Sequence, residues 1–343
     1  MRLKNKDIAE ALGISTTAVS LALNNRPGVS ESTRRRVLEL VSDSTQEAIQ
    51  TLIEDPGTNR HSILLNVHKK HGHIITDKPF FSDVVEAAQQ ELLRQGYNMI
   101  LSHYLPEQGL AQYIQYIKGL PIAGIILMAT EMEEEDLAAY KELDVPIMLM
   151  DSVFDLEDMD FVSLNNETDQ FRAFQYGVSL GHKRIGYLKS SVHINNFDHR
   201  LDGFQKGINR FGLENESHPI IELPCDVQGA YREMSTFLDR LPTDFVMPTL
   251  FLSDLDYIAL GAMSALKEHG YRIPEDISII GYDDVSTSAI SEPPLTTLRV
   301  NHSDIGRIAA KVLLDRLERL SSRPLTMQIS SELIIRESVK NIK

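Results

Sequence analysis

Residues 6–40 read KDIAEALGISTTAVSLALNNRPGVSESTRRRVLEL, three short segments separated by two turns. Apolar residues recur at helical spacing in each segment, and Gly13 stands where a helix C-terminus favours glycine. Ser15 is a candidate N-cap for a second helix over 16–23, and Ser30 opens a third. Helix, short glycine turn and helix form the geometry that places a second helix in the major groove of DNA.

The exposed side of this predicted second helix is small and polar. Thr16, Thr17 and Ser20 can contact phosphates or base edges without steric conflict. Residues 1–40 hold seven Lys/Arg and four Asp/Glu, whereas the whole chain has a net charge of −15. A basic segment on an acidic protein indicates a surface that docks on phosphate. The alternative, a helical cap without DNA contacts, is disfavoured because turn, polar face and basic cluster agree.

The same stretch resembles the DNA-binding headpiece of the lactose-repressor (LacI/GalR) family of bacterial transcription regulators. The matching residues include Asp7-Ile8-Ala9, Gly13-Ile14-Ser15, Ala18-Val19-Ser20 and Val29-Ser30. The resemblance implies a homodimer that reads a near-palindromic operator in double-stranded DNA. The DNA-binding residues that we predict are Lys6, Ser15, Thr16, Thr17, Ser20, Leu21, Asn24, Arg26, Ser30 and Thr33. Leu21 is apolar where relatives often carry arginine, so it can touch a thymine methyl group but cannot hydrogen-bond guanine.

A short amphipathic helix is predicted over residues 48–53, where the family has a hinge helix that enters the minor groove. Leu52 is the best candidate for an inserted wedge. The usual Tyr-x-Pro-Asn and Ala-Arg elements are missing, and Glu47, Glu54 and Asp55 put negative charge where phosphate should lie. A plain acidic linker helix is an equally good interpretation.

The bulk properties indicate a cytoplasmic protein without a membrane anchor. Cys225 is the single cysteine, so no internal disulfide is possible. The first ten residues contain no apolar signal segment, and no apolar run reaches the length of a membrane span. His68, His71 and His73 match no metal-ligand spacing, and no glycine-rich phosphate loop is present. We therefore expect no metal and no cofactor.

From residue 60 onward, short apolar strands alternate with helices, which is the pattern of doubly wound parallel sheets. The first set of predicted strands is Ile63–Val67, Asn98–Ser102, Ile122–Met128, Pro146–Met150 and Phe161–Leu164. The second set is Ile185–Leu188, Ile220–Leu223, Thr249–Leu252, Ile277–Tyr282 and Ile329–Ile335. The division that we predict is a headpiece with hinge (1–58) and a core (59–343), with an N-lobe of about 59–164 and 294–324 and a C-lobe of about 165–293 and 325–343.

The family resemblance extends over this core. It is carried by Gly181-His182-Lys183-Arg184, by Gly281-Tyr282-Asp283-Asp284 and by Pro294-Leu295-Thr296-Thr297. It implies an α/β fold in which an all-α helix-turn-helix headpiece precedes a periplasmic-binding-protein-like clamshell of two doubly wound parallel-sheet lobes. The chain of such a clamshell crosses between lobes three times, and we place the crossings near Leu164, Glu292 and Pro324.

Ligands of open wound sheets bind beyond the carboxyl ends of the strands. An arginine fork and carboxylates at such ends suit a polyhydroxylated ligand, because each hydroxyl can donate and accept. By resemblance, Arg200 and Asp283 match the sugar-binding pair of the family, and Ser82 and Asp151 match its first-lobe contacts. Aromatic residues here can stack on a sugar face. The effector-binding residues that we predict are Phe80, Ser82, Asp151, Ser191, Arg200, Asp256 and Asp283.

Some positions depart from a standard sugar site. Leu255-Asp256 replaces the familiar Asn-Asp pair, and Met128 and Val300 are apolar where some sugar-binding relatives are polar. A less usual glycoside, a non-sugar metabolite and a partner protein therefore stay open as ligands. Asp283 and Asp284 are expected on an extended segment, where neighbouring side chains point in opposite directions and form no acid–base pair.

Together these features predict a sequence-specific transcriptional repressor, not an enzyme. Its operator affinity changes when a small-molecule effector, a sugar or glycoside, binds between the two lobes. The alternative is a ligand-binding protein of the same fold with weakened or non-specific DNA binding.

Overall fold

The computed structural model describes residues 5–23, 28–30, 33, 36–37, 62–74, 79–154, 159–318 and 323–343. The chain divides into two compact units, residues 1–62 with 115–123 and residues 63–114 with 124–343. Several predicted DNA-contact or ligand-contact groups lie outside the described residues: the hinge segment with Leu52, the residues Asn24 and Arg26, and the side chains of Lys6 and Phe80.

The headpiece contains the helices α1 (Asn5–Leu12) and α2 (Thr16–Leu23). Their apolar sides pack together, as the helical spacing predicts. Val37, which follows α2 in the chain, is buried in the same cluster. The buried cluster consists of Ile8, Ala9, Val19, Ala22 and Val37.

The three predicted helix-end residues of the headpiece, Gly13, Ser15 and Ser30, adopt the expected conformation or hydrogen bond. Gly13 has a φ of +64°, the left-handed conformation that ends α1. The Ser15 hydroxyl accepts a hydrogen bond from the Ala18 amide at 3.1 Å, and the Ser30 hydroxyl accepts one from the Thr33 amide at 3.2 Å. Each bond satisfies an amide that the first turn of a helix leaves without a partner.

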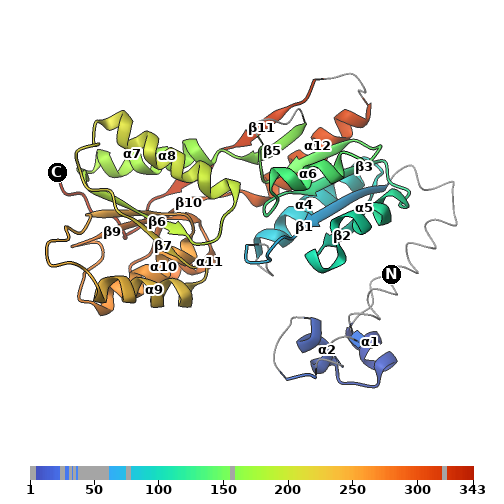
Figure 1. Ribbon diagram of the computed structural model, residues 1–343, viewed down its shortest axis with the longest axis horizontal. Helices are drawn as coiled ribbons and strands as arrows, with labels where there is room; N and C mark the ends of the chain where they lie inside the picture. Colours follow the sequence, from blue (N-terminus) through green and yellow to red (C-terminus); the bar gives the residue numbers. More distant parts are fainter. Residues whose placement is uncertain are drawn as a thin grey trace. The chain divides into compact units, whose positions relative to one another are not determined.

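Among the residues that the structure describes, the core unit contains two six-stranded sheets, each the centre of one lobe (Figure 1). In the first lobe the strand order is β11-β5-β4-β3-β1-β2. These strands are β1 (Ser62–His68), β2 (Asn98–Tyr104), β3 (Gly124–Met128), β4 (Ile147–Met150), β5 (Asp160–Leu164) and β11 (Thr326–Ile329). Every residue of β1, β3 and β5 is buried, as expected for parallel strands with both faces covered.

The second lobe repeats this order as β12-β10-β9-β8-β6-β7. Its strands are β6 (Ile185–Ser190), β7 (Ile220–Leu223), β8 (Leu250–Ser253), β9 (Ser278–Asp283), β10 (Thr296–Arg299) and β12 (Glu332–Ile334). The edge strand β12 pairs with β10 in the antiparallel direction, whereas β11 pairs with β5 in parallel. The second sheet is therefore mixed and not purely parallel.

Helices cover the sheets and pack in pairs. Figure 1 shows α7 and α8 on one face of the second sheet and α9 and α10 on the other. In the first lobe α4 packs against α12. The bounds are α4 (Pro79–Arg94), α5 (Leu110–Lys118), α6 (Glu134–Tyr140) and α12 (His302–Glu318), then α7 (Asn166–Ser179), α8 (Asn195–Phe211), α9 (Val227–Asp239), α10 (Asp256–Glu268) and α11 (Ser286–Ile290).

Two of the predicted crossings between lobes are displaced. The first lies directly after β5, as expected near Leu164. The second follows β10, because β10 pairs with β9 in the second sheet, and so it lies beyond Glu292. The third separates β11 from β12, beyond Pro324, so the single closing strand predicted over 329–335 is two strands in different sheets. The predicted lobe segments 294–324 and 325–343 therefore begin too early.

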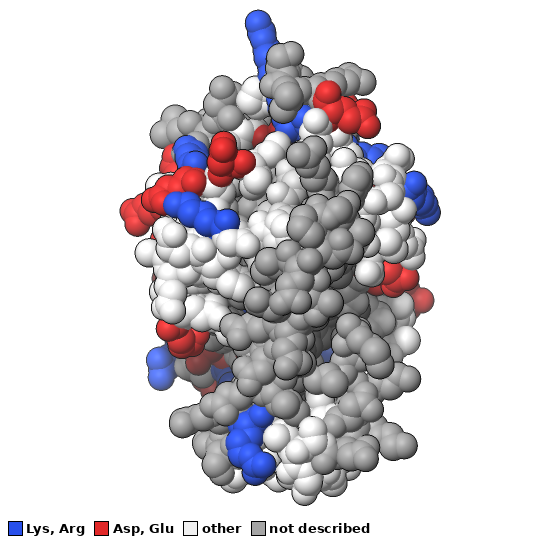
Figure 2. Space-filling view, turned by 90° about the vertical axis from the view of Figure 1, so that its right-hand side faces the viewer, with Lys and Arg blue, Asp and Glu red and all other residues white. Residues whose placement is uncertain are grey.

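The surface carries charges of both signs. Figure 2 shows acidic and basic side chains interspersed on one face, where the described residues form no extended area of one sign. No helix within the described ranges is long and apolar enough to cross a membrane.

Candidate functional site

A cavity of about 340 Å³ is bounded by both lobes at the carboxyl ends of their strands. The first lobe contributes the lining residues Ile74, Asp83, Thr130, Asp151 and Leu164. The second lobe and the segment after β10 contribute Ile194, Asn196, Phe197, Arg200, Leu255, Tyr257, Asp283, Asp284, Val285, Ser286, Arg299, Val300 and His302. Of the predicted effector residues, the structure thus brings Asp151, Arg200 and Asp283 together.

Asp151 follows β4 directly and lines the first-lobe side of the cavity. Its backbone has a φ of +64°, and its side chain is buried. The Thr130 hydroxyl donates to Asp151 Oδ2 at 2.7 Å, and Asn196 Nδ2 of the second lobe donates to the Asp151 carbonyl at 3.0 Å. Burial raises the pKa of Asp151 to about 6, although the bond from Thr130 opposes the shift.

Arg200 lies on α8 with its guanidinium held on several sides. Its Nε donates to Asn166 Oδ1 at 2.9 Å, and its Nη1 donates to the Asp254 carbonyl. The guanidinium carbon lies 3.5 Å from the centre of the Tyr282 ring, which is cation–π contact. These contacts fix the orientation of a buried cation at the cavity wall, so the group is already ordered before a ligand arrives.

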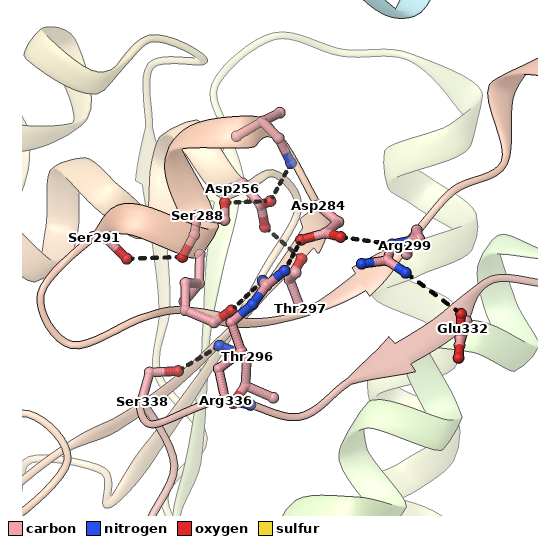
Figure 3. Close-up of polar contacts among 12 residues, drawn as sticks. Asp256, Asp284, Ser288, Ser291, Thr296, Thr297, Arg299, Glu332, Arg336 and Ser338 are labelled. Carbon is pink, nitrogen blue, oxygen red and sulfur yellow. Dashed lines mark hydrogen bonds and ion pairs between the residues drawn. The ribbon is translucent and has the colours of Figure 1, made fainter.

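Asp283 ends β9 and Asp284 follows it, in a conformation that the sequence did not predict. Their φ angles are +111° and +54°, so the segment is not extended, and both residues line the cavity. Asp284 forms ion pairs with Arg299 at 2.7 Å and with Arg336 at 2.6 Å (Figure 3). The charge of Asp284 is therefore compensated by two arginines of its own lobe.

Asp256 lies outside the cavity lining, beneath the turn that follows β9. Its carboxylate accepts bonds from Thr297 Oγ1 at 2.6 Å, from Ser288 Oγ at 2.7 Å and from the Val285 amide at 2.9 Å (Figure 3). Burial raises the pKa of Asp256 to about 7. The structure thus assigns this predicted ligand contact to support of the turn that carries Asp283.

Ser82 and Ser191 are exposed and do not line the cavity. Asp83, one residue after Ser82 on α4, does line it, so the prediction missed the helix face by one position. Asn196 was not predicted, although it precedes Arg200 by four residues on one helix, the spacing at which two side chains share a face. Thr130, Tyr257 and His302 carry no comparable signal in the sequence.

Part of the cavity wall is apolar. Ile194, Phe197 and Leu255 of the second lobe and Ile74 of the first belong to one buried cluster. Val300 also lines the cavity, whereas Met128 is buried outside the lining. The cavity therefore pairs hydrogen-bonding groups with an apolar surface, the combination typical of small-molecule sites.

The three histidines that match no metal-ligand spacing, His68, His71 and His73, do not share one environment. His68 is buried, with Nδ1 3.0 Å from the Tyr140 hydroxyl, and burial lowers the pKa of His68 to about 4. The rings of His71 and His73 stack with centroids 5.3 Å apart. Among the residues that the structure describes, no group of three or more His, Cys, Asp or Glu is placed to hold a metal ion.

The headpiece presents the predicted DNA-reading helix with its first residues exposed. Thr16 and Thr17 are exposed at the start of α2, and Ser20 and Leu21 are partly buried. Leu21 is close to the turn after α2, because a β-carbon added at Gly28 would lie 3.2 Å from its Cδ1. The exposed N-terminal end of such a helix is where base-contacting residues lie in helix-turn-helix proteins.

Both the headpiece and the core of the chain are similar to known protein families. Residues 5–54 match the family described as "Bacterial regulatory proteins, lacI family". Residues 174–339 match the family described as "Periplasmic binding protein-like domain". The HTH-type transcriptional repressor PurR of Mannheimia succiniciproducens is 30% identical over 98% of each chain. The chain belongs to the lacI family of bacterial regulatory proteins.

Solved structures of other transcriptional regulators share the fold. The lac repressor dimer bound to operator and the anti-inducer ONPF has a TM-score of 0.71 and 22% identity, over 99% of this chain and 100% of the other. The transcriptional regulator CelR in complex with cellobiose has a TM-score of 0.70 and 22% identity, over 98% and 100%. This member of the lacI family is thus a DNA-binding transcriptional regulator with an effector-binding core.

Proposed function

We propose that this protein is a cytoplasmic, homodimeric transcriptional repressor whose operator affinity changes when a small neutral sugar or glycoside binds in the core cavity. The headpiece and hinge (1–58) bind DNA, and the remainder binds the effector. The observation that carries the proposal is the joint lining of one cavity by Asp151 of the first lobe and by Arg200 and Asp283 of the second. A ligand that contacts all three biases the arrangement of the lobes, and such coupling is typically about 1–3 kcal/mol.

The chemistry of the cavity supports a neutral polyhydroxylated ligand. Among the described lining residues, the carboxylates of Asp83, Asp151 and Asp283 accompany the guanidinium of Arg200, whereas the second lining arginine, Arg299, is paired with Asp284. Carboxylates accept hydrogen bonds from hydroxyl groups and repel anions. The apolar wall at Phe197 suits the carbon face of a sugar ring. Phosphorylated sugars are disfavoured by the same charges.

The DNA-binding part of the proposal is supported by the capped, exposed start of α2 and by the relatives named as repressors. Its test is selection from a random DNA pool at near-physiological salt. Enrichment of a palindrome is expected. Binding without sequence preference and with a steep salt dependence would instead favour a ligand-binding protein with degraded operator recognition.

Within the selected operator, Thr17→Ala is expected to relax preference at one base position by about 1–3 kcal/mol. Ser264→Ala, a truncation of an exposed hydroxyl residue on α10 in the core, is the matched control and should leave the preference unchanged. Equal loss on all sequences would mean that Thr17 contacts phosphate and not a base.

The effector part is tested by titrating the full chain with ribose, sucrose, cellobiose and their phosphorylated counterparts by calorimetry. At least one neutral sugar is expected to bind, and Asp283→Asn should weaken it while Asp202→Asn, an exposed acid on α8, should not. Tighter binding of phosphorylated sugars would overturn the proposed ligand class. Binding that leaves operator affinity unchanged would overturn the proposed switch.

A further inference from the structure

The loop after β1, residues 69–74, is folded around a single buried carboxylate. Glu131 Oε2 accepts the amides of Lys70 at 3.0 Å, His71 at 3.2 Å and Gly72 at 2.8 Å. Its Oε1 accepts the amide of Ile74 at 2.9 Å. Four backbone donors thus converge on one side chain that is 0% exposed, a cradle in which consecutive amides bind an anion.

Further contacts tie this loop to the first lobe. Lys70 Nζ lies 2.6 Å from a Glu133 oxygen and 3.2 Å from an Asp136 oxygen at the start of α6. Gly72 has a φ of +69°, a conformation that favours glycine. Thr130, adjacent to Glu131, is the residue that donates to Asp151 in the cavity. Residues 130 and 131 therefore join the cavity lining to the loop.

The last described residue of this loop segment, Ile74, contacts the other lobe. Ile74 belongs to the first lobe, is 8% exposed and is part of the second-lobe apolar cluster that includes Ile194, Phe197 and Leu255. All four of these side chains also line the cavity. Burial of the Ile74 side chain removes apolar surface from water, and this burial favours contact between the two lobes.

We propose that Ile74 is a cross-lobe latch that closes one side of the effector cavity and limits the size of its ligand, with Glu131 as the positioning residue that holds the latch in place. The latch requires no effector, whereas its consequence for ligand size rests on the proposed function. Glu131 therefore affects more than the conformation of residues 69–74, because Ile74, the last of these residues, packs on the opposite lobe.

The latch is tested first without ligand, by hydrogen–deuterium exchange on the full chain. Ile74→Ala is expected to speed amide exchange at least about tenfold both in residues 69–74 and in residues 194–200 across the cavity. Ile114→Ala, an equal truncation of a buried isoleucine on α5 of the first lobe, should leave residues 194–200 unchanged. Faster exchange confined to residues 69–74 would overturn the latch.

The positioning role is tested with Glu131→Gln. Glutamine keeps the shape but retains one accepting oxygen, so it cannot serve the amides of both Gly72 and Ile74. Faster exchange is expected at the loop and, through Ile74, at residues 194–200. Glu133→Gln, which alters the exposed partner of Lys70, should leave residues 194–200 unaffected. A response of the loop alone would reduce Glu131 to a local structural residue.

The size limit is tested by thermal shift with ribose, sucrose and cellobiose. Ile74→Ala is expected to increase the ratio of disaccharide to monosaccharide affinity at least about tenfold, because the truncation enlarges the cavity on that side. An unchanged ratio would overturn the size limit. If none of these sugars binds either protein, the proposed effector class fails, and the exchange experiments still decide the latch.

Discussion

The two lobes repeat each other strand for strand, yet they hold their cavity carboxylates differently. β4 and β9 occupy the same place in their sheets, and each leads into an aspartate with positive φ, Asp151 or Asp283. Asp151 is held partly from the other lobe, by Asn196. The turn that carries Asp283 is held from within its own lobe, by Asp256. The first arrangement depends on lobe closure, and the second is complete without it.

The largest effect is expected from removal of the second-lobe support. Asp256→Ala leaves the buried hydroxyl donors of Ser288 and Thr297 and the partly buried amide of Val285 without their acceptor. We expect a loss of about 3–5 kcal/mol in the free energy of unfolding. Urea denaturation measures it, with Asp202→Ala as the exposed control. A loss below 1 kcal/mol would mean that the turn does not depend on Asp256.

A pH dependence follows from the same residue. The pKa of Asp256 is about 7 in the folded chain, against an ordinary value of 3.8. Between these values the folded state holds a proton that the unfolded state has released, so stability is lost as pH rises through this window. Asp256→Asn is always neutral and lacks this loss, so its free energy of unfolding relative to that of the original chain should rise by about 4 kcal/mol between pH 4 and pH 8. Parallel pH profiles would contradict the shift.

A matched pair of substitutions compares the lobes directly. Thr130→Val and Thr297→Val each remove one hydroxyl donor to a buried carboxylate, of Asp151 and Asp256 respectively. Each should cost about 1–2 kcal/mol in the free energy of unfolding. Only Thr130→Val should also alter exchange across the cavity, because Asp151 contacts the opposite lobe. Identical exchange patterns in the two variants would remove the proposed difference between the lobes.

The smallest effect is expected at the cross-lobe bond itself. Asn196→Ala removes the donor to the Asp151 carbonyl and the acceptor for Asn166 Nδ2. We expect the interaction free energy between the two lobes to weaken by about 1 kcal/mol. In calorimetry, the unfolding temperatures of the two lobes should then lie further apart. Asn209→Ala, near the exposed end of the same helix, is the control. A single unchanged transition would place the coupling elsewhere.

Local signals in the sequence were sufficient for much of this structure. The roles of Gly13 and Ser15 could be predicted from neighbouring residues alone, because a left-handed glycine and an N-cap serine act within one helical turn. The alternation of strands and helices indicated two lobes, since each short apolar run needs cover on both faces. Arg200 and Asp283 were located by the family resemblance, and Asp283 also lies at the end of a strand, where ligands of wound sheets bind.

Long-range choices were beyond those signals. Nothing in Thr296–Arg299 tells whether the strand pairs with the first sheet or the second, since both offer an apolar neighbour. Asp256 and Asp283 are both acids beside strand ends, and only the packed structure decides which faces the cavity and which lies beneath it. Ile74 looks like any loop isoleucine until its partners from the other lobe are known.

Asp283 and Asp284 both have positive φ angles, which lowers the stability of the fold but keeps two carboxylates at the cavity. Such a conformation in a residue other than glycine costs on the order of 1 kcal/mol or more. Glycine at either position would relieve that cost, but it would also remove a carboxylate that lines the cavity or that anchors Arg299 and Arg336. A population of variants selected only for heat resistance should therefore accumulate glycine at this turn, while selection for regulation should restore aspartate.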